Sequence, residues 1–208
     1  MIEAVLFDYG GVLTDGGKES STARAVAEFF GIESDKIDID DLQDSFGRGQ
    51  MTAEQFIAEL NLRYGQTKPI SASDYASINN DVYQPNVVVH GIVSKLRDHE
   101  IKTGIVSNIN ELIADRLAEA GGFVGFEPVI LSYEVGLRKP EPQIYQLALE
   151  TLDLPPESIL YIDDKPKNLE PAKALGMLTV HAAGEKQLSK VLPALFQRLN
   201  DIDIRELD

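Results

Sequence analysis

Short apolar runs alternate with amphipathic stretches through the second half of the chain, and one further apolar run lies near its start. The apolar runs are Ala4–Phe7, Lys102–Asn108, Pro128–Ser132, Ile159–Asp164 and Met177–His181. Stretches with helical periodicity follow the later runs or lie between them, at Gly91–Glu100, Glu111–Ala120, Gln143–Leu152, Leu169–Leu175 and Lys186–Leu199. Strands that alternate with helices of this length predict right-handed βαβ crossovers and a parallel sheet.

The segment from residue 15 to residue 87 breaks this rhythm, because it has helical patterns and no convincing strand. Thr52 is followed three residues later by Gln55, a capping-box pattern that predicts the start of a helix. Phe56 and Leu60 then fall on one face of that helix. The segment is therefore expected to form a helical insertion after the first strand.

These patterns predict an α/β protein, in which a Rossmann-like parallel sheet core carries an inserted helical cap domain. The core is expected to comprise residues 1–14 and 88–208, and the cap residues 15–87. An acidic run in the cap, Glu33–Asp44, lacks the spacing and the central glycine of an EF-hand, and we interpret it as a solvated loop or helix face.

Composition narrows the classes of function. The 208 residues carry a net charge of −15, and a surface this acidic should repel nucleic acid and anionic membranes. The chain has no cysteine, which excludes disulfides, thiol nucleophiles and thiolate metal sites. No apolar run approaches the roughly 20 residues that span a bilayer, and no signal peptide is recognised at the N-terminus. We expect a cytoplasmic monomer or homodimer that binds neither nucleic acid nor membranes.

Polar residues collect at the strand ends, where ligands of open parallel sheets bind. They are Asp8, Ser107, Asn108, Asp163 and Asp164, with Lys139 after the third strand. Each residue alone is well explained as a helix cap, a turn residue or a surface residue, but their coincidence at one edge is much less expected by chance. Three carboxylates at one edge repel one another unless a cation lies among them, and Mg²⁺ prefers carboxylate oxygens and pairs with phosphate. An aspartate is also an established type of nucleophile.

Four segments resemble, in order, the motifs of the haloacid dehalogenase superfamily of hydrolases. They are FDYGGVLTD, IVSN, GLRKPEPQIY and YIDDKPKNLEPAKALGM. The last two are most similar to those in the N-terminal phosphatase domain of soluble epoxide hydrolases and in related bacterial hydrolases, and the helical insertion stands where the family's type 1 cap belongs. The resemblance covers most of residues 3–181. It implies a Mg²⁺-dependent phosphatase that acts on a small phosphorylated metabolite, such as a sugar phosphate.

The resemblance also implies roles for single residues around the metal. Asp8 would be the nucleophile, would form an aspartyl-phosphate and would ligate Mg²⁺. Gly10 would offer its backbone carbonyl to the metal, and Asp164 would ligate it directly or through water. Asp163 would support its neighbour Asp164, and Asn168 stands where many relatives carry another acid.

On the substrate side, Ser107 would bind the phosphoryl group with Asn108 beside it, and Lys139 would pair with Asp8 and the phosphate. In the cap, Arg48 lies between two glycines in DSFGRGQMT, so its backbone is free to approach a ligand. Its guanidinium would then hold a second anionic group of the substrate. A flexible surface turn explains the same residues equally well.

Gly10 departs from the family pattern. Phosphatases of the family usually carry an aspartate there as general acid and base, which is typically worth ~10²–10⁴-fold in rate. Three interpretations stay open. In the first, the chain is a phosphatase in which solvent, Asp15 or an acid from the cap transfers the proton. In the second, it is a metal-independent 2-haloacid dehalogenase, since halide leaves without a proton. In the third, it is a catalytically impaired binding or regulatory protein. The paired acids Asp163 and Asp164 argue for a cation, and hence against the dehalogenase.

Overall fold

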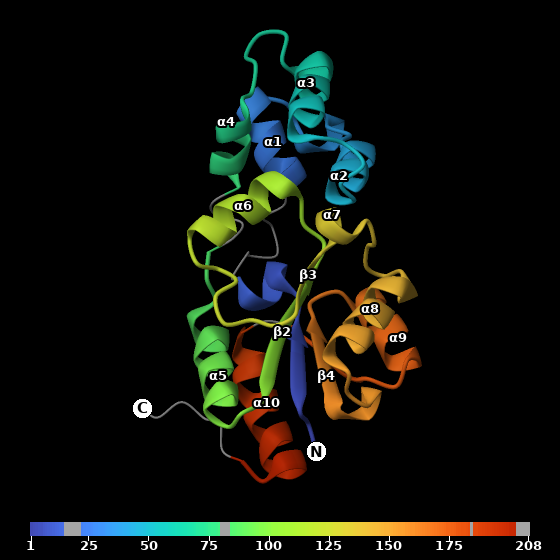
Figure 1. Cartoon of the computed structure of the whole chain (residues 1–208). Coiled ribbons are helices and arrows are strands. Elements are labelled where there is room, and N and C mark those ends of the chain that lie inside the picture. The colour runs from blue at the N-terminus through green and yellow to red at the C-terminus, as the bar shows by residue number, and fades with distance from the viewer. Residues whose placement is uncertain (15–21, 80–83, 184, 203–208) are drawn as a thin grey trace.

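A computed structural model describes residues 1–14, 22–79, 84–183 and 185–202 (Figure 1). Within these residues, one five-stranded parallel sheet has the strand order β3-β2-β1-β4-β5. The strands are β1 (Ala4–Phe7), β2 (Lys102–Ser107), β3 (Val129–Leu131), β4 (Ile159–Asp163) and β5 (Leu178–His181). The predicted parallel α/β fold is therefore confirmed, and each strand lies within one of the predicted apolar runs.

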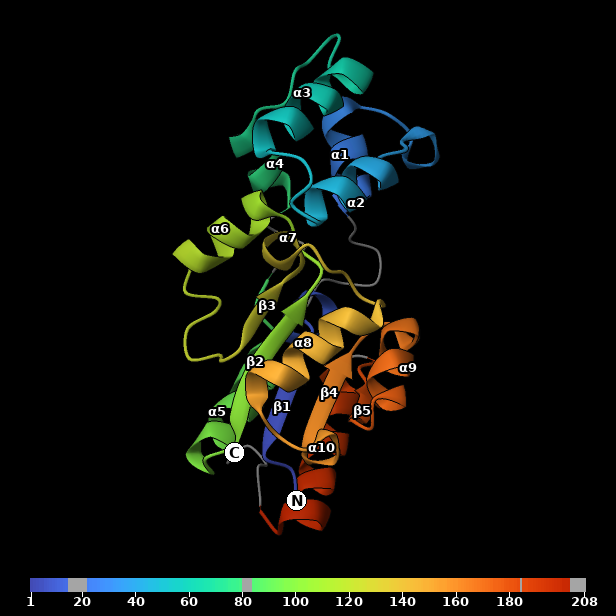
Figure 2. The same ribbon diagram turned by 45° about the vertical axis from the view of Figure 1, so that its right-hand side comes forward.

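Helices cover both faces of the sheet (Figures 1 and 2). One face carries α5 (Val87–Asp98) and α10 (Glu185–Asn200), and the other carries α8 (Pro142–Leu152) and α9 (Pro166–Ala174). Helices α6 (Glu111–Glu119) and α7 (Ser132–Val135) lie toward the cap, and the short 3-10 turn η4 (Pro156–Ser158) precedes β4. Alternate residues of β1 divide between two cores, as the pleat requires. Val5 and Phe7 pack in a core shared with α5 and α10, whereas Ala4 and Leu6 pack in one shared with α8 and α9.

Two helices begin three or four residues earlier than the hydrophobic pattern predicts. Helix α5 starts at Val87 rather than Gly91, because the Asn86 side chain accepts a hydrogen bond from the Val89 backbone N–H and caps the helix across a run of valines. Helix α9 starts at Pro166 rather than Leu169, since proline is suited to the first turn of a helix. The run of valines at the start of α5 and the polar first turn of α9 show no helical alternation of apolar and polar residues that would reveal either start.

The insertion after β1 forms a helical cap beyond the end of the sheet at which β1 and β4 finish (Figure 1). It contains α1 (Thr22–Phe30), the short turn η2 (Ser34–Lys36), α2 (Asp40–Gly47), α3 (Ala53–Tyr64) and α4 (Ala72–Ile78). The buried Phe56 ring joins three of these helices, because it stacks on Phe46 at 4.4 Å between centroids and meets Tyr75 edge-on at 5.0 Å. The predicted capping box of Thr52 and Gln55 is confirmed.

The chain passes between core and cap beside an isolated antiparallel bridge between Thr14 and Pro85. Residues 15–21 and 80–83, at the two ends of the predicted cap, lie outside the described part of the chain, so the boundaries 1–14, 15–87 and 88–208 stay a prediction. None of the described helices combines the length and apolarity that crossing a bilayer requires.

Candidate active site

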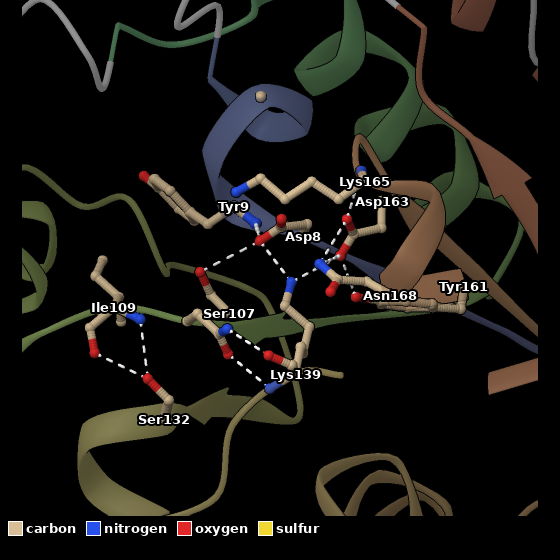
Figure 3. A network of polar contacts seen from close by, with 12 residues as sticks. Asp8, Tyr9, Ser107, Ile109, Ser132, Lys139, Tyr161, Asp163, Lys165 and Asn168 are labelled. Atoms are coloured by element: carbon tan, nitrogen blue, oxygen red, sulfur yellow. Dashed lines mark hydrogen bonds and ion pairs between the residues drawn. The ribbon is translucent and has the colours of Figure 1, made fainter. Parts of the chain in front are cut away.

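The sheet register brings two aspartates together at the centre of the sheet. Phe7 of β1 pairs with Ile162 of β4, so Asp8 and Asp163, the residues that follow each of them, stand side by side at the same edge. Ser107 ends β2 on the other side of β1. Lys139 enters from the loop between α7 and α8 and points between the two aspartates (Figure 3).

Asp8 is almost completely buried, and one of its carboxylate oxygens takes all of its side-chain contacts. Oδ1 accepts the Tyr9 backbone N–H at 2.7 Å, receives the Lys139 ammonium at 2.8 Å and lies 3.4 Å from the Ser107 hydroxyl. Among the described residues, Oδ2 has no hydrogen-bond partner. Burial raises the pKa of Asp8 to about 6, against the lowering effect of Lys139 and with a further rise from Asp163.

Lys139 is buried and bridges the two aspartates. Its Nζ lies 2.8 Å from Asp8 Oδ1 and 2.8 Å from Asp163 Oδ2. Burial disfavours the ammonium, but the two carboxylates outweigh it and raise the pKa of Lys139 above its ordinary value, so the group stays charged. The side chain of Asn108 holds the Lys139 backbone, since its Oδ1 accepts the N–H at 2.8 Å and its Nδ2 donates to the carbonyl at 2.9 Å.

Asp163 is fully buried, and both of its carboxylate oxygens accept hydrogen bonds. Besides Lys139, its partners are the Tyr161 hydroxyl, the Lys165 backbone N–H at 2.8 Å and the Asn168 Nδ2, 2.9 Å from Oδ1 (Figure 3). Burial alone would raise the pKa of Asp163, but Lys139 and the Tyr161 hydroxyl hold it below its usual range. Asp163 is therefore charged at neutral pH, and its carboxylate keeps Lys139 in place.

Asp164 has surroundings that suit the binding of a cation. Its Oδ1 is buried with no hydrogen-bond partner in the described structure, and burial raises the pKa of its carboxyl group. One carboxylate oxygen from each of Asp8, Asp163 and Asp164 can lie within 4.8 Å of the others. An unpartnered buried oxygen beside two more carboxylates costs free energy that a divalent cation would offset. The residues present fit an oxygen-ligated metal such as Mg²⁺.

The two adjacent glycines after Asp8 lie in one wide turn, η1 (Tyr9–Leu13), but their constraints differ. Gly11 has a φ of +77°, and a Cβ there would lie 2.8 Å from Asp164 Oδ2, so Gly11 lets that carboxylate approach the turn. Gly10 has a φ of −72°, and a Cβ there would meet no atom within 4 Å. Neither backbone strain nor lack of space therefore accounts for a glycine at position 10.

The other predicted site residues lie in varied surroundings. Asn108 uses both ends of its amide on the Lys139 backbone, and Asn168 is buried against Asp163. The guanidinium of Arg48 bonds to Asp44 and Glu141 and not to the described residues around Asp8. Asp15 lies outside the described residues. The roles predicted for all of these residues stay predictions.

Sequence reasoning missed two tyrosines beneath the site. Tyr161 donates its hydroxyl to Asp163, and Tyr145 donates to the Asn168 carbonyl at 2.7 Å while its ring meets that of Tyr161 at 5.4 Å. Both rings are buried in apolar elements. A tyrosine within an apolar strand or helix could have indicated such a contact, because a buried tyrosine hydroxyl usually finds a polar partner.

Comparisons with known proteins agree with this arrangement. A family model described as haloacid dehalogenase-like hydrolase matches residues 2–176. Bifunctional epoxide hydrolase 2 of Rattus norvegicus is 35% identical over 94 residues, which are 43% of this chain and 17% of the rat protein. The chain therefore matches a small part of that longer relative.

Two further proteins match over most of their length. Glyceraldehyde 3-phosphate phosphatase of Methanocaldococcus jannaschii is 25% identical over 205 residues, covering 86% of this chain and 84% of the relative. A solved haloacid dehalogenase family enzyme of Bacteroides thetaiotaomicron, in complex with magnesium and inorganic phosphate, superposes with a TM-score of 0.73 at 23% identity. That superposition covers 87% of this chain and 94% of the other, and it shows a shared fold.

Proposed function

Because the chain belongs to the haloacid dehalogenase-like hydrolases, we propose that it is a Mg²⁺-dependent phosphatase of a small phosphorylated metabolite. The observation that carries this proposal is the buried group of Asp8, Lys139 and Asp163 beside the unpartnered oxygen of Asp164. A nucleophilic carboxylate, a fixed ammonium and a set of metal ligands are the parts that phosphoryl transfer requires.

The metal would be held by Asp8, Asp164 and the backbone carbonyl of Gly10. When bound, Mg²⁺ supplies positive charge against the phosphate oxygens, which the acidic chain otherwise lacks. Asp163 contributes indirectly, since its hydrogen bonds fix it in place and it fixes Lys139.

The first chemical step uses the oxygen of Asp8 that has no described partner. Oδ2 attacks phosphorus, an aspartyl-phosphate bond forms, and the bond from phosphorus to the leaving oxygen breaks with its electron pair on that oxygen. Lys139 and the Ser107 hydroxyl stabilise the negative charge of the transferring group. Gly10 offers no side-chain proton, so the leaving oxygen takes its proton from solvent or from Asp15.

In the second step water attacks the phosphorus of the aspartyl-phosphate. The bond between phosphorus and the Asp8 oxygen breaks, inorganic phosphate leaves, and the water proton passes to solvent or to Asp15. Without an acid at position 10, we propose substrates whose leaving group is stable as an anion, such as the anomeric oxygen of a sugar phosphate. The similarity to a glyceraldehyde 3-phosphate phosphatase supports a small phosphorylated substrate.

One observation favours a second candidate, a 2-haloacid dehalogenase. Gly10 suits a halide leaving group, which needs no proton. The unpartnered Asp164 oxygen speaks for the phosphatase, because a metal-independent reaction at Asp8 has no use for a further carboxylate oxygen that is buried without a partner.

The proposal is tested by hydrolysis of p-nitrophenyl phosphate with Mg²⁺ and with EDTA. We expect Mg²⁺-dependent turnover that Asp8→Asn reduces by about 10³-fold or more, since the nucleophile is lost. Asp98→Asn, at an exposed aspartate of α5, is the matched control and keeps wild-type turnover. Equal rates for wild type and Asp8→Asn contradict the proposal, and chloride release from 2-chloropropionate in EDTA favours the dehalogenase.

A further inference from the structure

The loop that carries Lys139 lies directly against the cap. Ser132, at the start of α7, donates its hydroxyl to the carbonyl of Gly47 at the end of α2. Gly49 has a φ of +65°, and a Cβ there would lie 2.2 Å from the Tyr133 carbonyl oxygen. Gly49 therefore serves a close contact between the backbones of cap and core, and only glycine fits at that position.

Four charged side chains cross this junction. Arg48 places Nη1 and Nη2 at 3.1 and 2.6 Å from the two oxygens of Glu141, and its Nε lies 2.9 Å from Asp44. Arg138 reaches back from the loop to Asp44 at 3.1 Å and to the Gln43 carbonyl at 3.0 Å. Two positive and two negative groups leave the junction neutral, and each nitrogen of the Arg48 guanidinium already has a carboxylate partner. This is a poor place to capture an anionic substrate group.

Glu141 also closes the turn around Lys139. Its Oε2 accepts the Arg138 backbone N–H at 3.1 Å, and its own N–H donates to the Arg138 carbonyl at 2.8 Å. Asn108 holds the Lys139 backbone from the core side. The main chain that sets the position of Lys139 is therefore held from the core by Asn108 and from the cap by Arg48 acting through Glu141.

We propose that Arg48 and Glu141 clasp the cap to the Lys139 loop, and that Arg48 is a positioning residue for Lys139 rather than a ligand of the substrate. The catalytic consequence rests on the proposed function, in which Lys139 stabilises the transferring phosphoryl group. Displacement of a catalytic group by about 1 Å can cost on the order of 10²-fold in rate. The bidentate geometry requires arginine, because lysine lacks the planar fork that matches a carboxylate.

The experiment compares Arg48→Gln and Glu141→Gln with Arg63→Gln. Arg63 is the matched control, since it also pairs with two carboxylates, Asp41 and Glu59, but lies wholly within the cap. With p-nitrophenyl phosphate and Mg²⁺, we expect each clasp variant to lower kcat roughly tenfold with little change in KM, as for a misplaced catalytic group. We expect Arg63→Gln to match wild type and Arg48→Lys to fall between.

Hydrogen exchange gives a readout that does not depend on activity. We expect the amides of residues 136–139 and of Glu141 to exchange faster in both clasp variants and at an unchanged rate in Arg63→Gln. The double variant should lose no more than the worse single variant, since both act through one contact. A raised KM with unchanged kcat, or unchanged exchange, overturns the clasp. If the wild type is inactive, the proposed function fails, while exchange still decides whether the clasp holds the loop.

Discussion

The candidate active site and the helical cap are stabilised by different kinds of polar contact. In the site, Asp8, Ser107 and Lys139 come from distant parts of the chain, and the Lys139–Asp8 pair is at least 93% buried on both sides, with side-chain exposures of 1% and 7%. In the cap, ion pairs such as Arg24–Glu28 join residues four apart, and these two side chains are 50% and 67% exposed. The polar contacts of the site are thus buried and depend on the tertiary fold, whereas those of the cap are more exposed, whether they join neighbouring turns of one helix or, as Arg63–Asp41 does, two helices.

This difference determines what a substitution should cost. A buried charge that loses its partner keeps its desolvation penalty, whereas an exposed pair exchanges its partner for water at little cost. Substitutions in the site should therefore change stability and activity together, and those in the cap should change stability slightly and activity not at all. The junction of Arg48 and Glu141 is the exception, because it links the cap to Lys139.

Loss of the Lys139 charge should have the largest effect. Lys139→Met leaves Asp8 and Asp163 facing each other without a cation, and we expect unfolding free energy to fall by about 3–5 kcal/mol at neutral pH. Urea unfolding without added metal measures this loss. Lys173→Met, at an exposed position of α9, is the control and should change stability by less than about 0.5 kcal/mol. Similar losses of unfolding free energy for the two variants would contradict the difference between buried and exposed charges.

Position 10 tests whether the site can gain activity rather than lose it. The open space and ordinary φ at Gly10 allow Gly10→Asp to place an acid beside Asp8 without distortion. We expect kcat to rise by about 10²-fold for alkyl phosphates, whose leaving oxygen needs a proton, and far less for p-nitrophenyl phosphate.

Gly10→Ala is the control for this gain and should leave kcat unchanged. Gly11→Ala should instead weaken Mg²⁺ binding, because φ is +77° and the new Cβ would displace Asp164. A folded Gly10→Asp protein with no gain on alkyl phosphates shows that another group already transfers the proton.

Metal affinity should depend on pH through the buried carboxyl of Asp8. Its pKa of about 6 lies above the ordinary value of 3.8, so without metal the Asp8 carboxyl group is mostly protonated below pH 6 and mostly charged above it. Mg²⁺ binds the charged form, and its affinity should fall as the pH drops through 6, by up to about tenfold per pH unit for one proton displaced. Calorimetric titration between pH 5 and 7.5 measures this slope. Constant affinity over that range contradicts a role for Asp8 as a ligand.

Much of the fold and part of the site could be predicted, because both follow from patterns that a sequence displays. Apolar runs separated by helical periodicity specified the parallel sheet, and the carboxyl ends of parallel strands necessarily share an edge. That rule was enough to group Asp8, Ser107 and Asp163 before the structure was known. The strand order and the register that set Asp8 beside Asp163 could be learned only from the three-dimensional structure.

The rest depends on contacts between segments that no local pattern links. Arg48 and Glu141 lie 93 residues apart, and the glycines beside Arg48 indicated freedom to approach a ligand rather than the close approach of Tyr133. Asn108 was expected to bind substrate, which stays a prediction, and its amide spans the Lys139 backbone. These contacts of Arg48 and Asn108 arise only in the tertiary fold, so no local pattern could reveal them.

The capping box of α3 is a local and exposed contact, unlike the buried Lys139, and its loss should have the smallest effect on stability. Thr52 and Gln55 bond each other's backbone N–H groups at 3.2 and 2.9 Å, on an exposed part of the cap. Thr52→Ala frees one helix N–H to water and should lower the unfolding free energy by about 1 kcal/mol, measured by urea unfolding. Ser71→Ala removes the equivalent cap of α4 and should lower the unfolding free energy by a similar amount.

We expect kcat and KM to stay at wild-type values in both variants, because neither cap contacts the junction at Arg48. A fall in kcat would mean that the cap transmits local fraying to the site, and the contrast between the two regions would then fail.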